Sequence, residues 1–357
     1  MPSNSRTGGH EPAWGRLGGA IVRVLIVGGG GFVGAFTAAY FAERGHSVVT
    51  YDRRLPPEDV VAPHGDTIVG VTGDVLDRDR LAGVVKDYKI EGIVHAAAVI
   101  GQTDGAADPT WMFRINVEGT LNALEAARAA NCRLVYVATA TLYGQHPDLH
   151  PLSEDARPEP VGMYDTTKLM AETLAISYHK VYGLDVASVR PGYVFGYRTS
   201  TGSYFLDRVL AGEAIEQSVG ADLPMDLTYV KDLAQGIYLA MTVRPIEHRI
   251  FNVTGGVSRR RSEVADVVRR LVPEARIALG PGIPPTAHLR GASDLTRARA
   301  ELGYEPRFTL ESGMEDWLGY ERRAAERRAS GAAEPAAAEG PAKAGRAEAG
   351  ATERAAP

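Results

Sequence analysis

Apolar and polar positions alternate in blocks of strand and helix length along the first half of the chain. Residues 21–27 are apolar and β-branched almost throughout, as expected of a strand that is buried on both faces of a parallel sheet. Residues 32–44 carry a helical apolar pattern that ends at Gly45, and residues 47–51 are typical of a second strand that leads to Asp52. A strand, a glycine turn, a helix and a strand in this order predict a βαβ unit.

The same alternation continues to about residue 192. Further strands are predicted at residues 68–71, 92–95, 134–137 and 186–189, and helices at residues 78–88, 109–130 and 164–182. A helix at 228–242 and a strand at 250–254 are expected to return to the main sheet. The pattern predicts an α/β fold, with a doubly wound parallel sheet of the Rossmann type and a smaller mixed C-terminal portion that binds substrate.

The composition divides the chain into four regions. Residues from Ala324 onward contain no aromatic side chain and little apolar variety, so they cannot offset the entropy of ordering. The expected regions are a flexible leader at 1–20, an NAD-binding Rossmann domain at 21–192 plus 226–255, a substrate-binding portion at 193–225 plus 256–322, and a disordered tail rich in Ala, Glu and Arg at 323–357.

Charge and cysteine content narrow the class of protein. The chain has 357 residues, of which 45% are hydrophobic and 23% charged, as in ordinary globular proteins. A net charge of -5 gives no reason to expect a nucleic-acid or membrane partner. The single cysteine, Cys132, cannot form an internal disulfide, and no window holds about 18 consecutive apolar residues. We therefore expect a cytoplasmic protein, and the sequence suggests no metal site.

The turn after the first strand carries a G-x-x-G-x-x-G spacing at Gly28, Gly31 and Gly34. Glycines at these places let the backbone approach a pyrophosphate, which the N-terminus of the next helix also attracts. Asp52 follows about twenty residues later, where a carboxylate can accept hydrogen bonds from the adenosine ribose. Because that charge repels a 2'-phosphate, NAD is favoured over NADP. Arg53 could bind such a phosphate instead, although a solvated surface arginine is the simpler interpretation.

Tyr164 and Lys168 are four residues apart and share one face of a predicted helix. A phenol has a reference pKa of about 10, and a neighbouring ammonium would favour the phenolate. Such a pair can exchange a proton with a substrate hydroxyl. A half-buried tyrosine beside a solvated lysine is the simpler alternative for the pair alone, but the glycine turn and Asp52 supply a cofactor.

Several motifs follow one another in a fixed order along the chain. They are residues 28–34, Asp52, residues 73–75, 95–98, 116–120, 139–144, 164–168, 190–192, 229–234 and 301–306. Because of these motifs, the chain resembles the extended short-chain dehydrogenase/reductase family from about Val22 to Tyr320. Within it, the resemblance is to the NAD-dependent epimerase/dehydratase group, which includes the sugar-nucleotide 4-epimerases. The resemblance implies a homodimer, in which the helices near 109–130 and 162–182 pack against their copies.

The resemblance also implies roles for single residues. Thr139 would hold the substrate oxygen for Tyr164, and Asn116 would steady the helix beneath the active site. Lys168 would bind the nicotinamide ribose as well as acidify the phenol. Beside the three glycines and Asp52, the implied cofactor contacts are Phe32, Val33, Arg53, Asp74, Val75, Ala96, Ala97, Ala98, Tyr164, Lys168 and Pro191. The implied substrate contacts are Thr139, Thr141, Tyr164, Tyr193 and Arg198.

Two departures from the family pattern bear on the reaction. The 4,6-dehydratases carry Asp-Glu where this chain has Ala140 and Thr141, so dehydration and decarboxylation are not expected. Met225 stands where nucleotide-sugar enzymes usually have an arginine that pairs with the pyrophosphate. A second arginine of the family pattern, expected upstream of Asp294 near Pro284, is also not evident, although Arg290 or His288 could substitute for it from a nearby position. An uncompensated pyrophosphate would be costly to desolvate, which makes a smaller substrate credible.

Three hypotheses follow for the function. The first is an NAD-dependent epimerase of a sugar, in particular a nucleotide sugar, that works by reversible hydride transfer through a keto intermediate. The second is an NAD-dependent dehydrogenase or reductase of a smaller carbinol, such as a polyol, a uronate or a natural-product intermediate. The third is a cofactor-sensing protein without catalysis, which the presence of both Tyr164 and Lys168 disfavours.

Overall fold

Seven parallel strands form the central sheet of the computed structural model, which describes residues 23–100, 108–199, 204–285 and 287–329. The strands lie in the order β10-β6-β5-β4-β1-β2-β3. Their bounds are β1 (Arg23–Val27), β2 (Ser47–Asp52), β3 (Ile68–Thr72), β4 (Gly92–His95), β5 (Arg133–Val137), β6 (Val186–Arg190) and β10 (Ile250–Asn252). This is the order of a doubly wound nucleotide-binding sheet, so the predicted fold class is confirmed.

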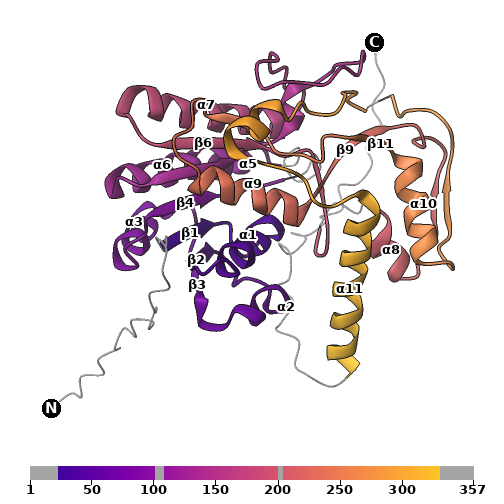
Figure 1. Ribbon diagram of the computed structural model, residues 1–357, viewed down its shortest axis with the longest axis horizontal. Coiled ribbons are helices and arrows are strands. Elements are labelled where there is room, and N and C mark those ends of the chain that lie inside the picture. Colours follow the sequence, from indigo (N-terminus) through magenta and orange to yellow (C-terminus); the bar gives the residue numbers. More distant parts are fainter. Residues whose placement is uncertain (1–22, 101–107, 200–203, 286, 330–357) are drawn as a thin grey trace, which may run out of the picture.

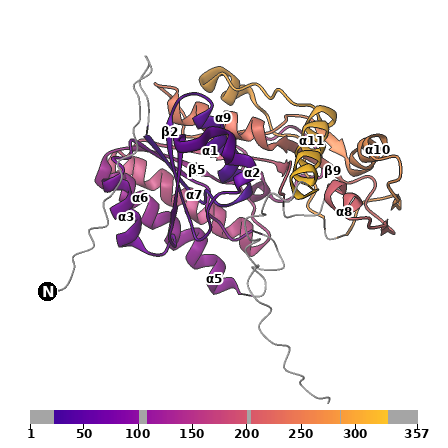
Figure 2. The same cartoon turned by 90° about the horizontal axis from the view of Figure 1, so that it is seen from below.

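Helices cover both faces of this sheet (Figures 1 and 2). Helices α1 and α9 pack on one face, and α3, α6 and α7 pack on the other. Their bounds are α1 (Phe32–Ala42), α3 (Arg78–Asp87), α6 (Gly119–Ala130), α7 (Met163–Tyr182) and α9 (Val230–Thr242). The side chains of Val24–Val27 in β1 alternate between the two layers and are almost fully buried, with Leu25 in one core and Ile26 in the other. This explains the continuous apolar run in its sequence.

A smaller portion beside the central sheet is built from two short sheets and three helices. The strand orders are β11-β9-β7, which is mixed, and β12-β8, which is parallel. The bounds are β7 (Tyr193–Phe195), β8 (Ile215–Gln217), β9 (Pro224–Tyr229), β11 (Ser258–Arg260), β12 (Ile277–Leu279), α8 (Leu206–Leu210), α10 (Arg261–Leu271) and α11 (Leu310–Ala329). The predicted mixed C-terminal portion is therefore present.

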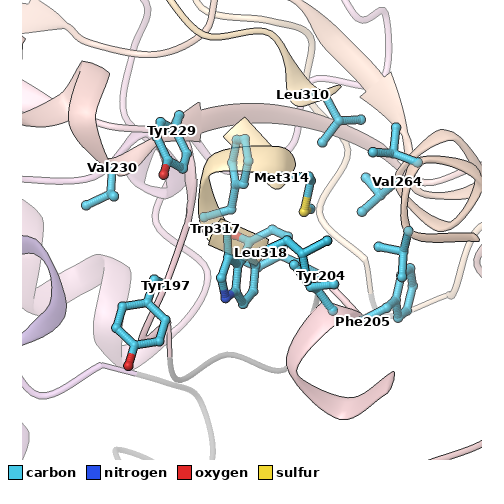
Figure 3. Packing of buried hydrophobic residues seen from close by; sticks show 14 of the residues in the cluster. Tyr197, Tyr204, Phe205, Tyr229, Val230, Val264, Leu310, Met314, Trp317 and Leu318 are labelled. Atoms are coloured by element: carbon cyan, nitrogen blue, oxygen red, sulfur yellow. The ribbon is translucent and has the colours of Figure 1, made fainter. Parts of the chain in front are cut away.

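The smaller portion has its own apolar core, in which aromatic side chains dominate (Figure 3). Trp317 and Met314 of α11 are almost completely buried there, beside Tyr229 of β9. Phe36 of α1 contacts Tyr320 of α11 edge-to-face, with 5.5 Å between ring centroids. The same core thus joins the smaller portion to the helix that follows the glycine turn.

Two element boundaries differ from the sequence prediction. Thr228 pairs with Val194 in a parallel ladder, so it belongs to β9, and the helix begins only at Val230. Helix α11 runs to Ala329, past residue 323, where the sequence predicts disorder to begin. Ala324 is 6% exposed, because the apolar core of the smaller portion extends under this turn. The leader at 1–20 and the tail from residue 330 lie outside the described residues.

No helix in the described part of the chain is both long enough and apolar enough to cross a bilayer.

Candidate active site

The glycine turn between β1 and α1 leaves no room for a side chain at Gly28 or at Gly34. Gly28 has a φ of 91°, and a Cβ on it would lie 2.4 Å from the nitrogen of Ala97. A Cβ on Gly34 would lie 2.1 Å from the oxygen of Gly28. Gly31 donates its N–H to that same oxygen at 3.1 Å. The turn therefore forms a narrow concave backbone surface, the cradle, at the N-terminus of α1. Phe32 and Val33 are the first residues of the helix after it.

Asp52 lies directly beside this cradle at the end of β2. Its Oδ2 accepts a hydrogen bond from the N–H of Gly30 at 3.2 Å, and its Oδ1 accepts one from the N–H of Arg54 at 3.2 Å. The carboxylate is half-buried, whereas Arg53 is exposed, with its guanidinium 5.4 Å from the Trp111 ring. Cradle and carboxylate together fit an adenine dinucleotide with free ribose hydroxyls.

The loops after β3 and β4 line the same edge of the sheet. The N–H of Gly73 donates to the oxygen of Asp52 at 2.9 Å, which places Asp74 and Val75 next to the β2 end. Ala96 donates its N–H to Val27 at 2.8 Å and so lies beside the glycine turn. Ala97, packed against Gly28, and Ala98 follow it. The structure thus gathers the sequence-predicted cofactor contacts along one edge.

Three side chains of the acid/base site meet at the ends of β5 and α7. Lys168 is 2% exposed, and its Nζ donates to the oxygen of Val137 at 2.6 Å and lies 4.4 Å from the Tyr136 ring centroid. Thr139 follows two residues after that carbonyl, and its hydroxyl lies near enough to the half-buried Tyr164 to lower the pKa of the phenol. The end of β5 therefore holds both the threonine and the lysine of the predicted triad.

Pro191 adjoins this site from the next strand. Its carbonyl accepts a hydrogen bond from the N–H of Ala140 at 2.7 Å, and Ala140 directly follows Thr139. The contact fixes the loop after β6 against the loop after β5. Tyr193 comes two residues later, in β7, so the smaller portion begins close in the chain to this contact.

The pKa values of the pair are set mainly by burial. Burial raises the pKa of Tyr164 to about 12, the Asp165 carboxylate acts in the same direction, and the hydrogen bond with Thr139 opposes both. Burial lowers the pKa of Lys168 to about 7, against the charge of Glu172. Desolvation is the largest cause of the pKa shift at both residues, and the expectation that the Lys168 ammonium favours the phenolate stays a prediction.

Asn116 lies in a widened helical turn between two α-helical pieces. The predicted continuous helix at 109–130 is interrupted by a π-helical segment, Arg114–Glu118, between α5 (Pro109–Phe113) and α6. Asn116 Oδ1 accepts from the N–H of Val99 at 2.8 Å, and its Nδ2 donates to Thr167 Oγ1 at 3.0 Å. Since π turns occur often at functional sites, this placement agrees with the role that the family resemblance implies.

The candidate substrate residues fall into two groups. Thr141 lies in the acid/base site, with its Oγ1 2.9 Å from that of Thr139. Tyr193 lies in β7, two residues after Pro191, whose carbonyl contacts Ala140. Arg198 instead forms an ion pair with Asp59 of α2 (Glu58–Val61), with 2.9 Å between Nη2 and Oδ2. The structure thus brings Thr141 to Thr139, while Arg198 is held at α2.

The structure adds two residues that sequence reasoning did not assign to the site. Asp165 accepts a hydrogen bond from Thr141 Oγ1, and its place next to Tyr164 was the available signal. Arg290, named from the sequence only as a possible substitute, is 6% exposed and has its guanidinium 5.0 Å from the Tyr193 ring. Nothing local in the sequence indicates this second contact, because the fold alone brings residue 290 to β7.

Comparison with known proteins identifies the family of this chain. Residues 24–254 match the model of the NAD dependent epimerase/dehydratase family. The chain belongs to this family. A UDP-glucose 4-epimerase of Mycolicibacterium smegmatis is 28% identical over 323 residues, covering 85% of this chain and 100% of the relative. A UDP-glucose 4-epimerase of Corynebacterium glutamicum is 29% identical over 323 residues, covering 83% of this chain and 94% of the relative.

Solved structures agree with this assignment. The UDP-glucose 4-epimerase of Thermus thermophilus in complex with NAD is 25% identical, with a TM-score of 0.75, covering 85% of this chain and 99% of that structure. As a member of the epimerase/dehydratase family, the protein is an NAD-dependent enzyme of the extended short-chain dehydrogenase/reductase type. Its cofactor is NAD, which the cradle at Gly28 and Gly34 and the carboxylate of Asp52 fit.

Proposed function

We propose that the protein is a nucleotide-sugar epimerase that oxidises a sugar carbinol to a ketone and reduces it again on the other face. The observation that carries this proposal is the position of Thr139 next to Tyr164, where it lowers the phenol pKa, together with the buried Lys168 at the end of β5. A hydroxyl, Thr141, occupies the place of the second acid of the dehydratases. One acid/base residue is sufficient for oxidation and reduction, whereas elimination of water requires a further pair.

The residues of the site have distinct tasks in this reaction. Tyr164 removes the carbinol proton and later returns it, and Thr139 holds the same oxygen in reach of the phenol. Lys168, fixed by the carbonyl of Val137, supplies positive charge behind the phenol when it is protonated. NAD, held at the glycine turn and Asp52, would supply the acceptor and donor of the hydride.

Arg290 supports an anionic substrate. Its Nη2 is fully buried without a hydrogen-bond partner among the described residues, and the side chain lies over the ring of Tyr193. A buried guanidinium nitrogen without a hydrogen-bond partner is costly unless an anion is bound, and phosphate is a good match for the geometry of a guanidinium. Met225, where relatives have an arginine, lies in the apolar core of the smaller portion at 2% exposure. Arg290 thus offers the charge that position 225 lacks.

The proposal is tested by incubating the purified full chain with UDP-, GDP- and dTDP-sugars and following the products by NMR. We expect an epimerised product without added NAD and without net NADH. Arg290→Met is expected to raise KM for that substrate about tenfold or more, in line with the loss of one charge-assisted contact. Inactivity across the panel, together with reduction of added NAD by a polyol or a uronate, would favour the smaller-carbinol alternative instead.

One variant distinguishes an enzyme from a cofactor-sensing protein without catalysis. Tyr164→Phe keeps the ring and removes the proton donor, so activity is expected to fall about 10²- to 10⁴-fold while NAD binding stays. If the unaltered protein binds NAD but turns over no substrate from either panel, the cofactor-sensing hypothesis gains instead.

Helices α6 and α7 support the expected homodimer. They leave apolar side chains exposed at Leu121 (38%), Met170 (43%) and Val181 (70%). Such side chains are commonly covered at subunit interfaces. Light scattering is expected to give twice the monomer mass at micromolar concentration, and a monomer there would refute the dimer.

A further inference from the structure

A crevice of about 340 Å³ lies between the helices on one face of the main sheet and the smaller portion. Helices α1, α2 and α9 line one side, and α11 with the loop before it lines the other. Figures 1 and 2 show α11 running beside α1 and α2. The described lining contains none of the acid/base residues and none of the cofactor contacts predicted from the sequence. Small-molecule sites have volumes of about 300–1,000 Å³ and favour the junction between two packed units.

Four basic side chains line this crevice, and three of them come from the smaller portion. They are Lys231 of α9, Arg307 in the loop before α11, and Arg323 and Arg327 of α11. The Lys231 ammonium pairs with Asp316 at 2.7 Å. Within the described ranges, no carboxylate oxygen lies within 4.0 Å of the guanidinium of Arg307 or Arg323. Arg323 instead lies over the Tyr320 ring, 4.5 Å from its centroid.

An uncharged side chain fixes Arg307 at the wall of the crevice. Gln235 of α9 is 5% exposed and donates its amide N–H to the carbonyl of Glu305 at 2.7 Å. Its amide oxygen then accepts from Nε and Nη2 of Arg307 at 2.9 and 3.3 Å. The guanidinium is thereby oriented by a neutral group that leaves its charge in place, and Nη1 takes no part in this contact.

The three carboxylates that line the crevice are engaged by other groups. Asp232 is buried, and its two oxygens accept backbone N–H groups of the loop before α11 at 2.8 and 3.0 Å, so its charge offsets part of that of the nearby guanidinium. Asp59 forms an ion pair with Arg198, and Glu43 lies 3.5 Å from Arg44. The crevice thus combines satisfied carboxylates with guanidinium groups that can still bind an anion.

We propose that the crevice is a second ligand site, which binds a small phosphate monoester through Arg307 and Arg323. A phosphate monoester carries about 1.5 to 2 negative charges near neutral pH, and its oxygens match the planar donors of a guanidinium. A carboxylate would bring only one charge to these cations. Lys231 adds positive charge from α9, and Tyr40 and Phe308 offer aromatic surface to the rest of the ligand. The site does not depend on the proposed function, because it shares no residue with the hydride-transfer site.

A ligand in this crevice connects the two parts of the molecule. Helix α1 begins at the glycine turn, and its Phe36 contacts Tyr320 of α11. Tyr320 also stacks on Tyr197, with 5.2 Å between ring centroids. A bound phosphate monoester adds contacts across the same junction, so it holds the smaller portion against α1. Thermal unfolding should therefore move to a higher temperature when the ligand binds.

Calorimetric titration of the full chain tests the site. The protein is saturated with NAD, which fills the cradle, and is titrated with glucose 1-phosphate, glucose 6-phosphate, AMP and UMP. We expect a Kd below about 1 mM for at least one probe. Arg307→Gln and Arg323→Gln should each weaken that binding about tenfold or more, through loss of a charge-assisted contact. Arg322→Gln is the matched control with unaltered affinity, because Arg322 is exposed on α11 and does not line the crevice.

The outcomes separate this site from the others. Absence of binding by every probe, or equally tight binding of glucose and uridine, would overturn the proposal. So would binding that Arg290→Met abolishes and Arg323→Gln leaves intact, since the probe then occupies the substrate site. Arg323 is exposed, so its variant carries the test even if Arg307→Gln fails to fold. Binding at the crevice without turnover of any nucleotide sugar would reject the proposed function and keep this site, and turnover without such binding would do the reverse.

Discussion

Arg190 and Glu172 form a buried ion pair behind the acid/base site, with 2.5 Å between Nη2 and Oε2 and side chains that are 3% and 2% exposed. Glu172 lies one helical turn after Lys168 on α7, and Arg190 ends β6. Ser188 donates a further hydrogen bond to Glu172 Oε1 at 2.7 Å. The pair therefore fixes the catalytic helix against the sheet and places a negative charge near Lys168.

Removal of one partner should be strongly destabilising. Glu172→Gln leaves Arg190 buried without a counter-charge, and we expect a loss of about 3–5 kcal/mol in the free energy of unfolding, measured by urea denaturation. Asp266→Asn is the matched control, because its pair with Arg269 is solvent-exposed and should contribute below about 1 kcal/mol. Equal losses in the two variants would contradict a special role for the buried pair.

The glycine turn should tolerate no side chain at position 34. Gly34→Ala would place a Cβ 2.1 Å from the Gly28 oxygen, so the turn must move and NAD affinity should fall at least about tenfold. Gly83→Ala is the control, since its Cβ would meet nothing within 4 Å on α3, and it should stabilise the fold by about 0.5–1 kcal/mol. Calorimetric titration measures the NAD affinity of both variants, and urea denaturation measures the stability of Gly83→Ala. Unchanged NAD affinity in Gly34→Ala would contradict a cofactor site at this turn.

Asn116 should matter for rate more than for cofactor affinity. Asn116→Ala breaks the bonds to Val99 and to Thr167, whose Oγ1 donates to the Tyr164 carbonyl at 3.0 Å. We expect about 10²-fold lower kcat from misplacement of the phenol, with about 1–3 kcal/mol lower stability. Thr167→Val removes only the link to α7 and should lower kcat while the Val99 contacts keep the loop. A kcat that is unaltered in both variants would show that the network is only structural.

The buried Lys168 should give a distinct pH dependence of stability. Its pKa is lowered from 10.5 to about 7 in the folded protein, so between these values the unfolded chain binds a proton that the native state does not. The free energy of unfolding of the NAD-free protein should therefore rise with pH in this window, relative to that of Lys168→Met. Chemical denaturation of both proteins at pH 6, 8 and 10 measures the difference, and a constant difference would contradict the lowered pKa.

Local sequence patterns were sufficient to predict the main sheet and the cofactor turn and acid/base pair at its edge. The apolar run that ends at Val27 and the spacing of Gly28 and Gly34 predicted a cofactor turn, because these constraints act within a few residues. Tyr164 and Lys168 share a helix, so their common face followed from a period of 3.6 residues. The same short-range reasoning could not place the end of α11 or the π turn at Asn116, which depend on contacts with distant elements.

The sequence by itself determined the fold class, the NAD cradle and the acid/base pair, since each depends on neighbours along the chain. Only the tertiary structure decided the environment of that pair. Burial raises the Tyr164 pKa and lowers that of Lys168, opposite to what two neighbouring residues in water would suggest. Asp165 accepts a hydrogen bond from Thr141, and Arg290 lies over Tyr193, because folding brings together segments that are distant in the sequence.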